Sequence, residues 1–321
     1  MAIGDVKRQL RRLDGRVYSN AAEIVTIKSD VEFAQRPFQV QRGEQAFGQP
    51  HTARTDADER RVIELEVVNA ANTQHLETYK SFLYNRLQRK GSDSKDIHRL
   101  AARDRHVFAA LMLAHGHGDG LVTGATRKSA HVLERLNHVF DANAKHGAVG
   151  ITALLHKGRI VFIGDTLVHE WPDEEDLADI AERAASVARG LGLVPRVAFA
   201  SFSTFGYPVS ERATKMHLAS DALDKRHVDF EYDGEMTVDV ALNPDQMKHY
   251  PFCRLTGPAN VLVVPARHSA SISTKLLQEL GGATVIGPIL TGVDKPVQII
   301  STGSTVNDIL NMAAISACNI G

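Results

Sequence analysis

From Gly118 onward, short apolar runs alternate with stretches of helical periodicity, and this alternation limits the possible folds more than any other feature. The apolar runs have the length of buried strands, and they are Leu121–Thr123, Ile160–Ile163, Val197–Ala200, Val261–Val264 and Ala283–Leu290. Strands that are apolar on both faces need cover on both faces, which crossover helices supply in parallel sheets. The pattern therefore predicts an α/β fold with mostly parallel sheets covered by helices.

The stretches between these runs carry apolar residues at helical spacing. Asp173 to Leu191 is the clearest case, because its apolar residues share one face and its acidic first turn suits the positive end of the helix dipole. Further helices are predicted over residues 75–89, 96–114, 209–225, 271–280 and 306–318, with Gly91 ending the first. Earlier in the chain we expect a surface helix within residues 1–20, a linker over 41–61 and a strand over 62–68.

Composition excludes several classes of partner. The formal net charge is -1, which gives no overall field for steering nucleic acid or anionic membranes. No apolar run approaches the roughly 20 residues of a membrane-spanning helix. Cys253 and Cys318 are the two cysteines, far apart in sequence, which favours a reducing compartment and a cytoplasmic protein. We therefore expect neither nucleic acid nor a membrane as a partner.

Two segments rich in hydroxyl groups and glycine follow apolar strands, where parallel α/β sheets bind ligands. One segment is Ser201–Gly206, and the other is Gly287–Pro288 together with residues 295–308. Their backbone amides and hydroxyls suit an anionic ligand. Helix capping is the alternative for the second segment, with Ser304 or Thr305 capping the helix that includes Asp308. The pattern alone favours capping.

Two other clusters have simple explanations. His115 and His117 are flanked by glycines, but no third metal ligand lies nearby, so a loop between a helix and a strand is favoured over a metal site. Basic residues gather in the first third of the chain, and solvated helix faces explain most of them, while one or two could contact a CoA phosphate. They are Arg86, Arg89, Lys90, Arg99, Arg103, Arg105, Arg127 and Lys128.

Several runs, in the same order, resemble the phosphate acetyl/butyryltransferase family. They are residues 196–206, 233–242, 257–265, 281–290 and 295–317. Residues 87–91, 103–110 and 250–255 are similar to the C-terminal domain of hybrid NADP-dependent malic enzymes in particular. The resemblance assigns residues 62–321 to a phosphate acetyl/butyryltransferase-like domain and leaves residues 1–61 as a divergent N-terminal segment and linker.

The resemblance implies two subdomains around a cleft, similar to isocitrate dehydrogenase, with acetyl-CoA bound in the cleft and a homodimer or higher oligomer as the unit. It also implies a malic-enzyme catalytic domain as partner; NADP and a divalent metal would belong to that domain, which this chain lacks, either as a fragment or as an orphaned module. The residues that the resemblance assigns to ligand binding are Arg127, Ser203, Thr204, Gly206, Ser301, Thr302, Gly303 and Asp308.

Three departures from the family pattern affect the expected chemistry. Thr302 replaces an arginine, Phe205 a lysine and Glu134 another arginine, whereas Ser301 and Asp308 are retained. Attack of phosphate on a thioester builds up negative charge and needs fixed positive charge. We therefore expect acetyl-CoA to bind as a ligand or effector while transacetylase activity is lost. The alternatives are an active phosphate acetyltransferase and a purely structural dimerisation domain.

Overall fold

The computed structural model describes residues 68, 70, 73–141 and 147–318. The predicted N-terminal surface helix, the linker and residues 62–67 of the predicted strand lie outside this part of the chain. The first described elements are α2 (Leu76–Leu87), the short 3-10 helix η3 (Gln88–Lys90), α3 (Ser94–Arg103), α4 (Arg105–Ala114), β1 (Leu121–Gly124) and α5 (Ser129–Leu136). Gly91 follows η3 with a φ of 86° in the left-handed region, which confirms the predicted end of the first helix.

The single helix predicted over residues 96–114 is wrong, because the chain breaks at Asp104 into α3 and α4. Asp104 has extended backbone angles, and its carboxylate accepts the backbone N–H groups of His106 and Val107 at 3.0 and 3.2 Å. Those amides are the unpaired donors of the first turn of α4. An N-cap therefore interrupts a stretch whose apolar periodicity continues across it.

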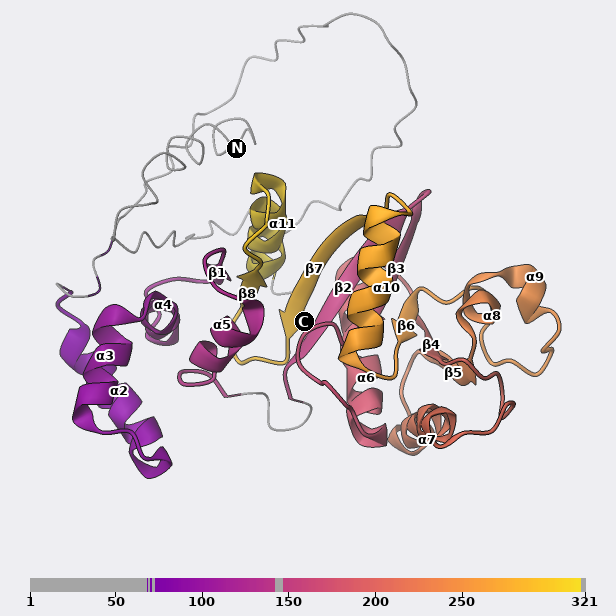
Figure 1. Cartoon of the computed structure of the whole chain (residues 1–321), viewed down its shortest axis with the longest axis horizontal. Helices are drawn as coiled ribbons and strands as arrows, with labels where there is room; N and C mark the ends of the chain where they lie inside the picture. Colours follow the sequence, from indigo (N-terminus) through magenta and orange to yellow (C-terminus); the bar gives the residue numbers. More distant parts are fainter. Residues whose placement is uncertain (1–67, 69, 71–72, 142–146, 319–321) are drawn as a thin grey trace, which may run out of the picture.

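A small subdomain is built around a two-stranded parallel sheet, in which β1 pairs with β8 (Val297–Ile300). Helices α2 to α5 surround this sheet at one end of the molecule (Figure 1). Their shared core includes the fully buried Leu83, Val107, Phe108 and Val132. The segment 295–308, expected to be a ligand-binding stretch after the last strand, thus contains a strand of its own.

The large subdomain contains a six-stranded sheet in the order β5-β4-β6-β3-β2-β7. Its strands are β2 (Val149–His156), β3 (Arg159–Gly164), β4 (Arg196–Ala200), β5 (Glu231–Met236), β6 (Val261–Val263) and β7 (Thr284–Thr291). Strands β5, β4, β6 and β3 run parallel, whereas β2 pairs antiparallel with both β3 and β7. The mostly parallel α/β architecture is confirmed.

Helices cover both faces of this sheet (Figure 1). They are α6 (Glu174–Gly190), α7 (Glu211–Arg226), α8 (Val238–Leu242), α9 (Pro244–Met247), α10 (Arg267–Glu279) and α11 (Val306–Ala317). Along β6, Val261 and Val263 join the core that includes α6 and α7, while Leu262 joins the opposite core that includes α8 and α10. Among the described residues, no helix is long and apolar enough to cross a membrane.

Candidate functional site

The carboxyl ends of β1 and β8 lie side by side. They bring the predicted ligand residue Arg127 close to the predicted segment of residues 295–308. Gly124 pairs with Ile300 in the parallel register, and the amide of Ala125 donates to the carbonyl of Ile300 at 3.3 Å. The loop that carries Arg127 therefore borders the loop that begins at Ser301. Arg127 is exposed, as are Ser301, Thr302 and Gly303. This edge of the small sheet, the β1–β8 edge, offers hydroxyls and one guanidinium to solvent.

The loop after β8 is held by local hydrogen bonds that lead into α11. The Oγ of Ser304 accepts the amide of Ser301 at 3.0 Å and lies 3.2 Å from the Ser301 Oγ. Thr305 is the N-cap of α11, and Asp308 accepts its amide and hydroxyl at 2.7 and 2.9 Å. The predicted capping role of Thr305 is confirmed. The carboxylate of Asp308 thus completes a capping box and stabilises the start of a helix.

The other predicted segment, Ser201–Gly206, follows β4 and lies against the end of β5. Ser203 is fully buried, and its hydroxyl donates to Glu235 Oε1 at 3.2 Å. The amide of Gly206 donates to the same oxygen at 2.6 Å. Thr204 joins the loop to Thr237, because the two hydroxyls lie 3.1 Å apart and the Thr237 amide also donates to Thr204. These contacts fix the loop along the β4–β5 edge.

Glu235 is the residue of this edge that the sequence analysis did not single out. It is 1% exposed, and among the described residues its Oε2 atom has no hydrogen-bond partner, with Nδ1 of His217 at 3.6 Å. A buried carboxylate is costly unless it accepts hydrogen bonds, and here the loop supplies them to Oε1. The available signal was that Glu235 lies inside one of the runs that carry the family resemblance.

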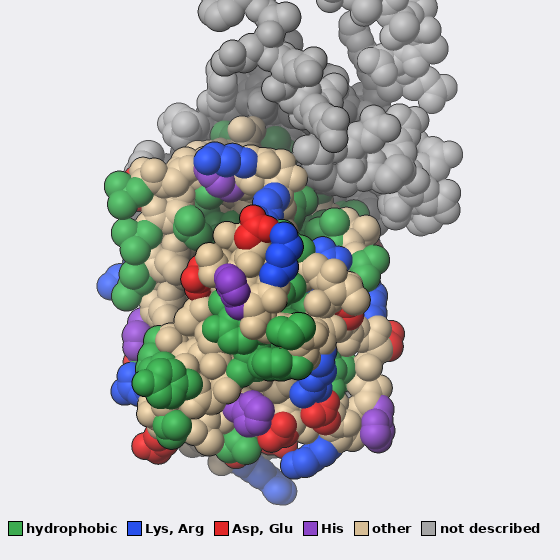
Figure 2. Space-filling view, turned by 90° about the vertical axis from the view of Figure 1, so that its right-hand side faces the viewer, with side chains coloured by type: hydrophobic (Ala, Val, Ile, Leu, Met, Phe, Trp, Pro, Cys, Tyr) green, Lys and Arg blue, Asp and Glu red, His purple; other side chains and the backbone are tan. Residues whose placement is uncertain are grey.

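Phe205 stands in this loop where the family pattern has lysine, and it presents an aromatic surface. Its backbone φ is 48°, in the left-handed region that costs a non-glycine residue about 1 kcal/mol or more. Its ring lies 5.4 Å from that of Tyr250 and 4.9 Å from that of Phe252. Hydrophobic side chains gather at the centre of the face that includes this end of the molecule (Figure 2). No cation is fixed at this position of the loop.

The two groups of predicted ligand residues therefore lie on two different sheets. Arg127 and residues 301–303 meet at the β1–β8 edge, whereas Ser203, Thr204 and Gly206 meet at the β4–β5 edge. Within the part of the chain that the structure describes, no hydrogen bond or ion pair joins the two groups. Glu134 lies on α5, is 63% exposed and has His131 Nδ1 at 3.9 Å. Both sets of loops follow parallel strands, the usual position of ligands in such sheets.

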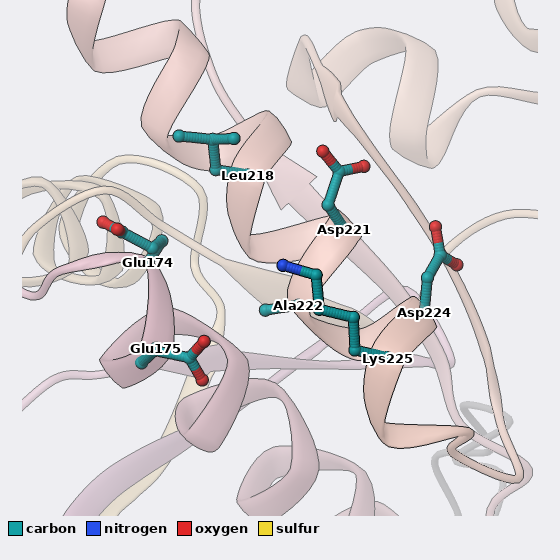
Figure 3. A pocket seen from close by; sticks show the side chains of 7 residues that line it. All are labelled: Glu174, Glu175, Leu218, Asp221, Ala222, Asp224 and Lys225. Carbon is teal, nitrogen blue, oxygen red and sulfur yellow. The ribbon is translucent and has the colours of Figure 1, made fainter.

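A pocket of about 440 Å³ opens elsewhere, between α6 and α7. Its lining includes four carboxylates and one lysine, and Figure 3 shows them: Glu174, Glu175, Asp221, Asp224 and Lys225, with Leu218 and Ala222. Glu175 pairs with Arg226, and Asp224 pairs with Arg254. None of the predicted ligand residues lines this pocket. Its acidic lining would repel the phosphates of an acyl-CoA.

The histidines that follow α4 form an aromatic group. The hydroxyl of Tyr79 lies 2.6 Å from His117 Nδ1, and the rings of His75 and His117 are 4.3 Å apart. Burial raises the pKa of Tyr79 to about 12, and burial also lowers the pKa of His117. Among the described residues, no cluster of three or more His, Cys, Asp or Glu is suited to a metal ion. The predicted loop between a helix and a strand is confirmed.

Comparison with known proteins agrees with this architecture. The family model for phosphate acetyl/butaryl transferase matches residues 47–317. An NADP-dependent malic enzyme of Rhizobium meliloti (strain 1021) is 47% identical over 321 residues, which cover 98% of this chain and 41% of that protein. A phosphate acetyltransferase of Corynebacterium glutamicum is 32% identical over 260 residues, covering 79% of this chain and 78% of that protein.

A solved structure gives the same fold. A phosphotransacetylase from Streptococcus pyogenes superposes with a TM-score of 0.73 and 26% identity, covering 79% of this chain and 78% of that one. The chain spans about two fifths of the length of the Rhizobium malic enzyme, 41%, and most of the length of the phosphate acetyltransferases. With the family model matching most of the sequence and the fold agreeing, the chain belongs to the phosphate acetyl/butaryl transferase family.

Proposed function

We propose that this chain is an acyl-CoA-binding domain that has lost efficient transfer of acetyl to phosphate, and that it regulates and helps to assemble a malic enzyme. One observation carries the proposal. The two ligand loops, Ser201–Gly206 and Ser301–Thr305, keep their hydroxyls and glycines but contain no lysine or arginine. Hydroxyls and amides are enough to hold a neutral thioester carbonyl, but not to stabilise the dianionic phosphate that attacks it.

Asp308 takes part in the local anchoring of the loop after β8. The Oδ2 atom of Asp308 accepts the amide and hydroxyl of Thr305, at 2.7 and 2.9 Å. The carboxylate acts in helix capping, and the Ser301 hydroxyl is turned to Ser304. Arg127 is an exposed guanidinium beside the β1–β8 edge, and we expect it to attract a CoA phosphate without organising the transfer of acetyl to phosphate.

Self-association would use the outer face of α10. Ile272, Leu276, Leu277 and Leu280 are exposed on or just after this helix, at a spacing that places them on one stripe. Monomers rarely expose such a continuous apolar stripe. We propose that a second copy of the chain packs here.

The malic-enzyme role comes from the relatives. The curated protein that matches 98% of this chain is an NADP-dependent malic enzyme, of which the chain covers 41%. We propose that a malic-enzyme catalytic domain, with its NADP and divalent metal, is the partner, and that acyl-CoA bound at the two loops changes its activity. A purely structural role would need no ligand, and an active transferase would need turnover.

Calorimetric titration of the purified chain with acetyl-CoA separates the ligand-binding roles from the purely structural one. We expect saturable binding with one site per chain, and light scattering that reports a dimer at micromolar concentration. Absence of binding to a folded dimer would leave the structural role, and a monomer would remove the assembly role. Leu276→Glu on the α10 stripe should dissociate the dimer. The control Leu218→Glu, at a leucine of α7 that is 43% exposed against 52% for Leu276, should leave the dimer intact.

The double variant Thr302→Arg with Glu134→Arg tests the missing cations. Both side chains are exposed, so the added charges remain solvated and the fold should hold. We expect tighter binding of inorganic phosphate than in the parent, with effects that are not additive if both groups meet one anion. Unchanged phosphate affinity in the folded double variant would contradict the placement of these positions at one ligand site.

A further inference from the structure

Trp171 is the only tryptophan of the chain, and its surroundings resemble a subsite for a charged aromatic ligand. It lies between β3 and α6 and is 58% exposed. The guanidinium carbon of Arg212 lies over its ring, 5.4 Å from the centroid, and the ring of His268 meets it edge-on at 4.7 Å. The three side chains come from three separate elements, because Arg212 is in the first turn of α7 and His268 in the first turn of α10.

This cluster, Trp171 with Arg212 and His268, lies along the same sheet edge as the loop Ser201–Gly206. Strands β4, β6 and β3 are parallel neighbours in that order, so the segments that follow them leave from one edge. Neighbouring strands are about 4.8 Å apart, so β3 and β4, on either side of β6, are about 10 Å apart. A ligand the length of a CoA can therefore reach from the cluster to the loop.

Basic residues lie at this edge in the first turns of α7 and α10, where the positive end of the helix dipole disfavours them. Arg212 follows Glu211 in the first turn of α7, and Arg267 is the first residue of α10. Helix α10 also has no acidic residue in its first turn and no side-chain cap from Ala266, so its first amides remain available. Positive groups and free amides converging on one place are suited to an anion outside the protein.

The acidic residue Glu170 pairs with Arg267 and not with Arg212, so the positive charge of Arg212 is not neutralised by an ion pair among the described residues. Glu170 lies 3.4 Å from Arg267, which also donates to the carbonyl of Leu167 at 3.2 Å. Lys215 adds a further cation, its Nζ donating to the carbonyl of Pro172 at 3.2 Å. Glu211 precedes Arg212 at the start of α7. Among the described residues, Arg212 makes the ring contact with Trp171 and no ion pair.

We propose that this cluster binds the nucleotide end of an acyl-CoA, a purine ring that carries phosphate groups. The inference rests on the proposed acyl-CoA binding and names the residues of its nucleotide subsite. The indole provides the stacking surface, and base stacking on an aromatic side chain tolerates a neighbouring guanidinium. Arg212, His268 and the first amides of α10 face the phosphates. The acyl end then extends along the sheet edge toward Ser201–Gly206.

Because Trp171 is the only tryptophan, its fluorescence reports on this position alone. We would titrate the chain with adenosine 3′,5′-bisphosphate, which holds the base and phosphates without the thioester. The expected result is a saturable change in Trp171 emission, with adenosine binding at least about tenfold more weakly because it lacks the phosphates. No saturable change at millimolar bisphosphate would overturn the proposal.

Variants then separate this inference from the proposed function. Trp171→Leu should weaken acetyl-CoA binding about 5-fold to 100-fold in calorimetry, and Arg212→Gln about 5-fold. Arg189→Gln, in the last turn of α6 and paired with Asp229, is the matched control and should have no effect. Circular dichroism would verify the fold of each variant, and both substituted side chains are exposed.

Acetyl-pantetheine, which lacks the nucleotide, should bind the parent and the Trp171 variant equally. If acetyl-CoA binds the parent but Trp171→Leu and Arg212→Gln bind it unchanged, the nucleotide subsite is wrong and the proposed function stands. If acetyl-CoA does not bind the parent although the bisphosphate still changes Trp171 emission, the acyl-CoA function fails and a nucleotide site remains.

Discussion

The two ligand loops follow parallel strands in the same way, yet they are held by different means. The loop after β4 is anchored across strands, because Ser203 and Gly206 both donate to the buried Glu235 of β5. The loop after β8 is anchored locally, by Ser304 and by the cap of α11. Hydrogen bonds to a buried charge are worth more than bonds that water can replace. The β4–β5 edge should therefore be rigid and sensitive to substitution, and the β1–β8 edge tolerant.

The largest expected effect is that of Glu235→Ala. The change leaves the Ser203 hydroxyl and the Gly206 amide without their acceptor inside the protein, at a cost of about 1–3 kcal/mol each, so about 2–6 kcal/mol in total. Urea denaturation measures the loss. Glu235→Gln is the control, because it keeps an oxygen acceptor and should lose much less. A folded Ala variant as stable as the parent would remove the contrast between the edges.

Thr305→Ala probes the other edge with a smaller effect. The Thr305 hydroxyl caps the amide of Asp308, and N-cap removal typically costs about 1 kcal/mol. Thr305→Ser keeps the hydroxyl and should stay close to the parent in the same urea assay. A loss as large as that of Glu235→Ala would show that this loop is anchored by more than its helix cap.

These anchors explain why the sequence predicted some parts and not others. Apolar strands such as β4 and β6 can be predicted from the sequence, because strands buried on both faces are continuous apolar runs. Strand β5, Glu231–Met236, contains three acidic residues and a glycine, and it is buried because its acids accept backbone amides that are distant in sequence, as Asp233 accepts Arg254. Such partners exist only after folding. The break at Asp104 was local and could have been predicted from an N-cap residue inside the helical stretch.

The candidate site, like the fold, could be predicted where it depends on local sequence and not where it depends on distant strand pairing. The hydroxyl loops follow from their place after strands and from the resemblance, and the cap at Thr305 follows from its spacing to Asp308. That Arg127 and Ser301 share an edge depends on the pairing of β1 with β8, which are about 170 residues apart in sequence, and strand β8 itself was not predicted. Non-local pairing carries no signal in a single sequence.

Two histidines should give the subdomains opposite responses to pH. In the large subdomain, the hydrogen bond to Asp165 raises the pKa of His169, so its stabilising contribution is present below the unfolded pKa of about 6.5 and is lost as pH rises through the higher folded value. In the small subdomain, burial lowers the pKa of His117 in the folded protein. The folded protein therefore keeps its full stability above the unfolded pKa of about 6.5, and it loses stability as the pH falls from there toward the lower folded pKa.

Urea denaturation from pH 5 to 8 would test this pair of effects. His169→Gln should lessen the loss of stability on raising the pH, and His117→Gln should lessen the loss on lowering it. Matching pH profiles for the two variants would contradict the assignment of opposite shifts. Nuclear magnetic resonance titration of the two imidazoles would give each pKa separately.

The smallest effect on stability is expected for Arg127→Gln. The side chain is exposed, and surface substitutions usually change stability by less than about 0.5 kcal/mol. Acetyl-CoA affinity should nevertheless fall about 5-fold, because the attraction of the Arg127 guanidinium for the phosphate groups of the ligand is lost. Lys128→Gln, also exposed and adjacent in sequence, is the matched control in the calorimetric titration. Equal affinities for all three proteins would take Arg127 out of the ligand site.

The proposed function requires that the chain binds acetyl-CoA without transferring its acetyl group to phosphate. Release of free CoA thiol from acetyl-CoA in the presence of phosphate measures that transfer directly. We expect thiol release by the purified chain no faster than in the same buffer without protein, at acetyl-CoA concentrations that saturate binding. Phosphate-dependent turnover that disappears in Ser301→Ala would contradict it and show that the loops catalyse transfer without the missing cations.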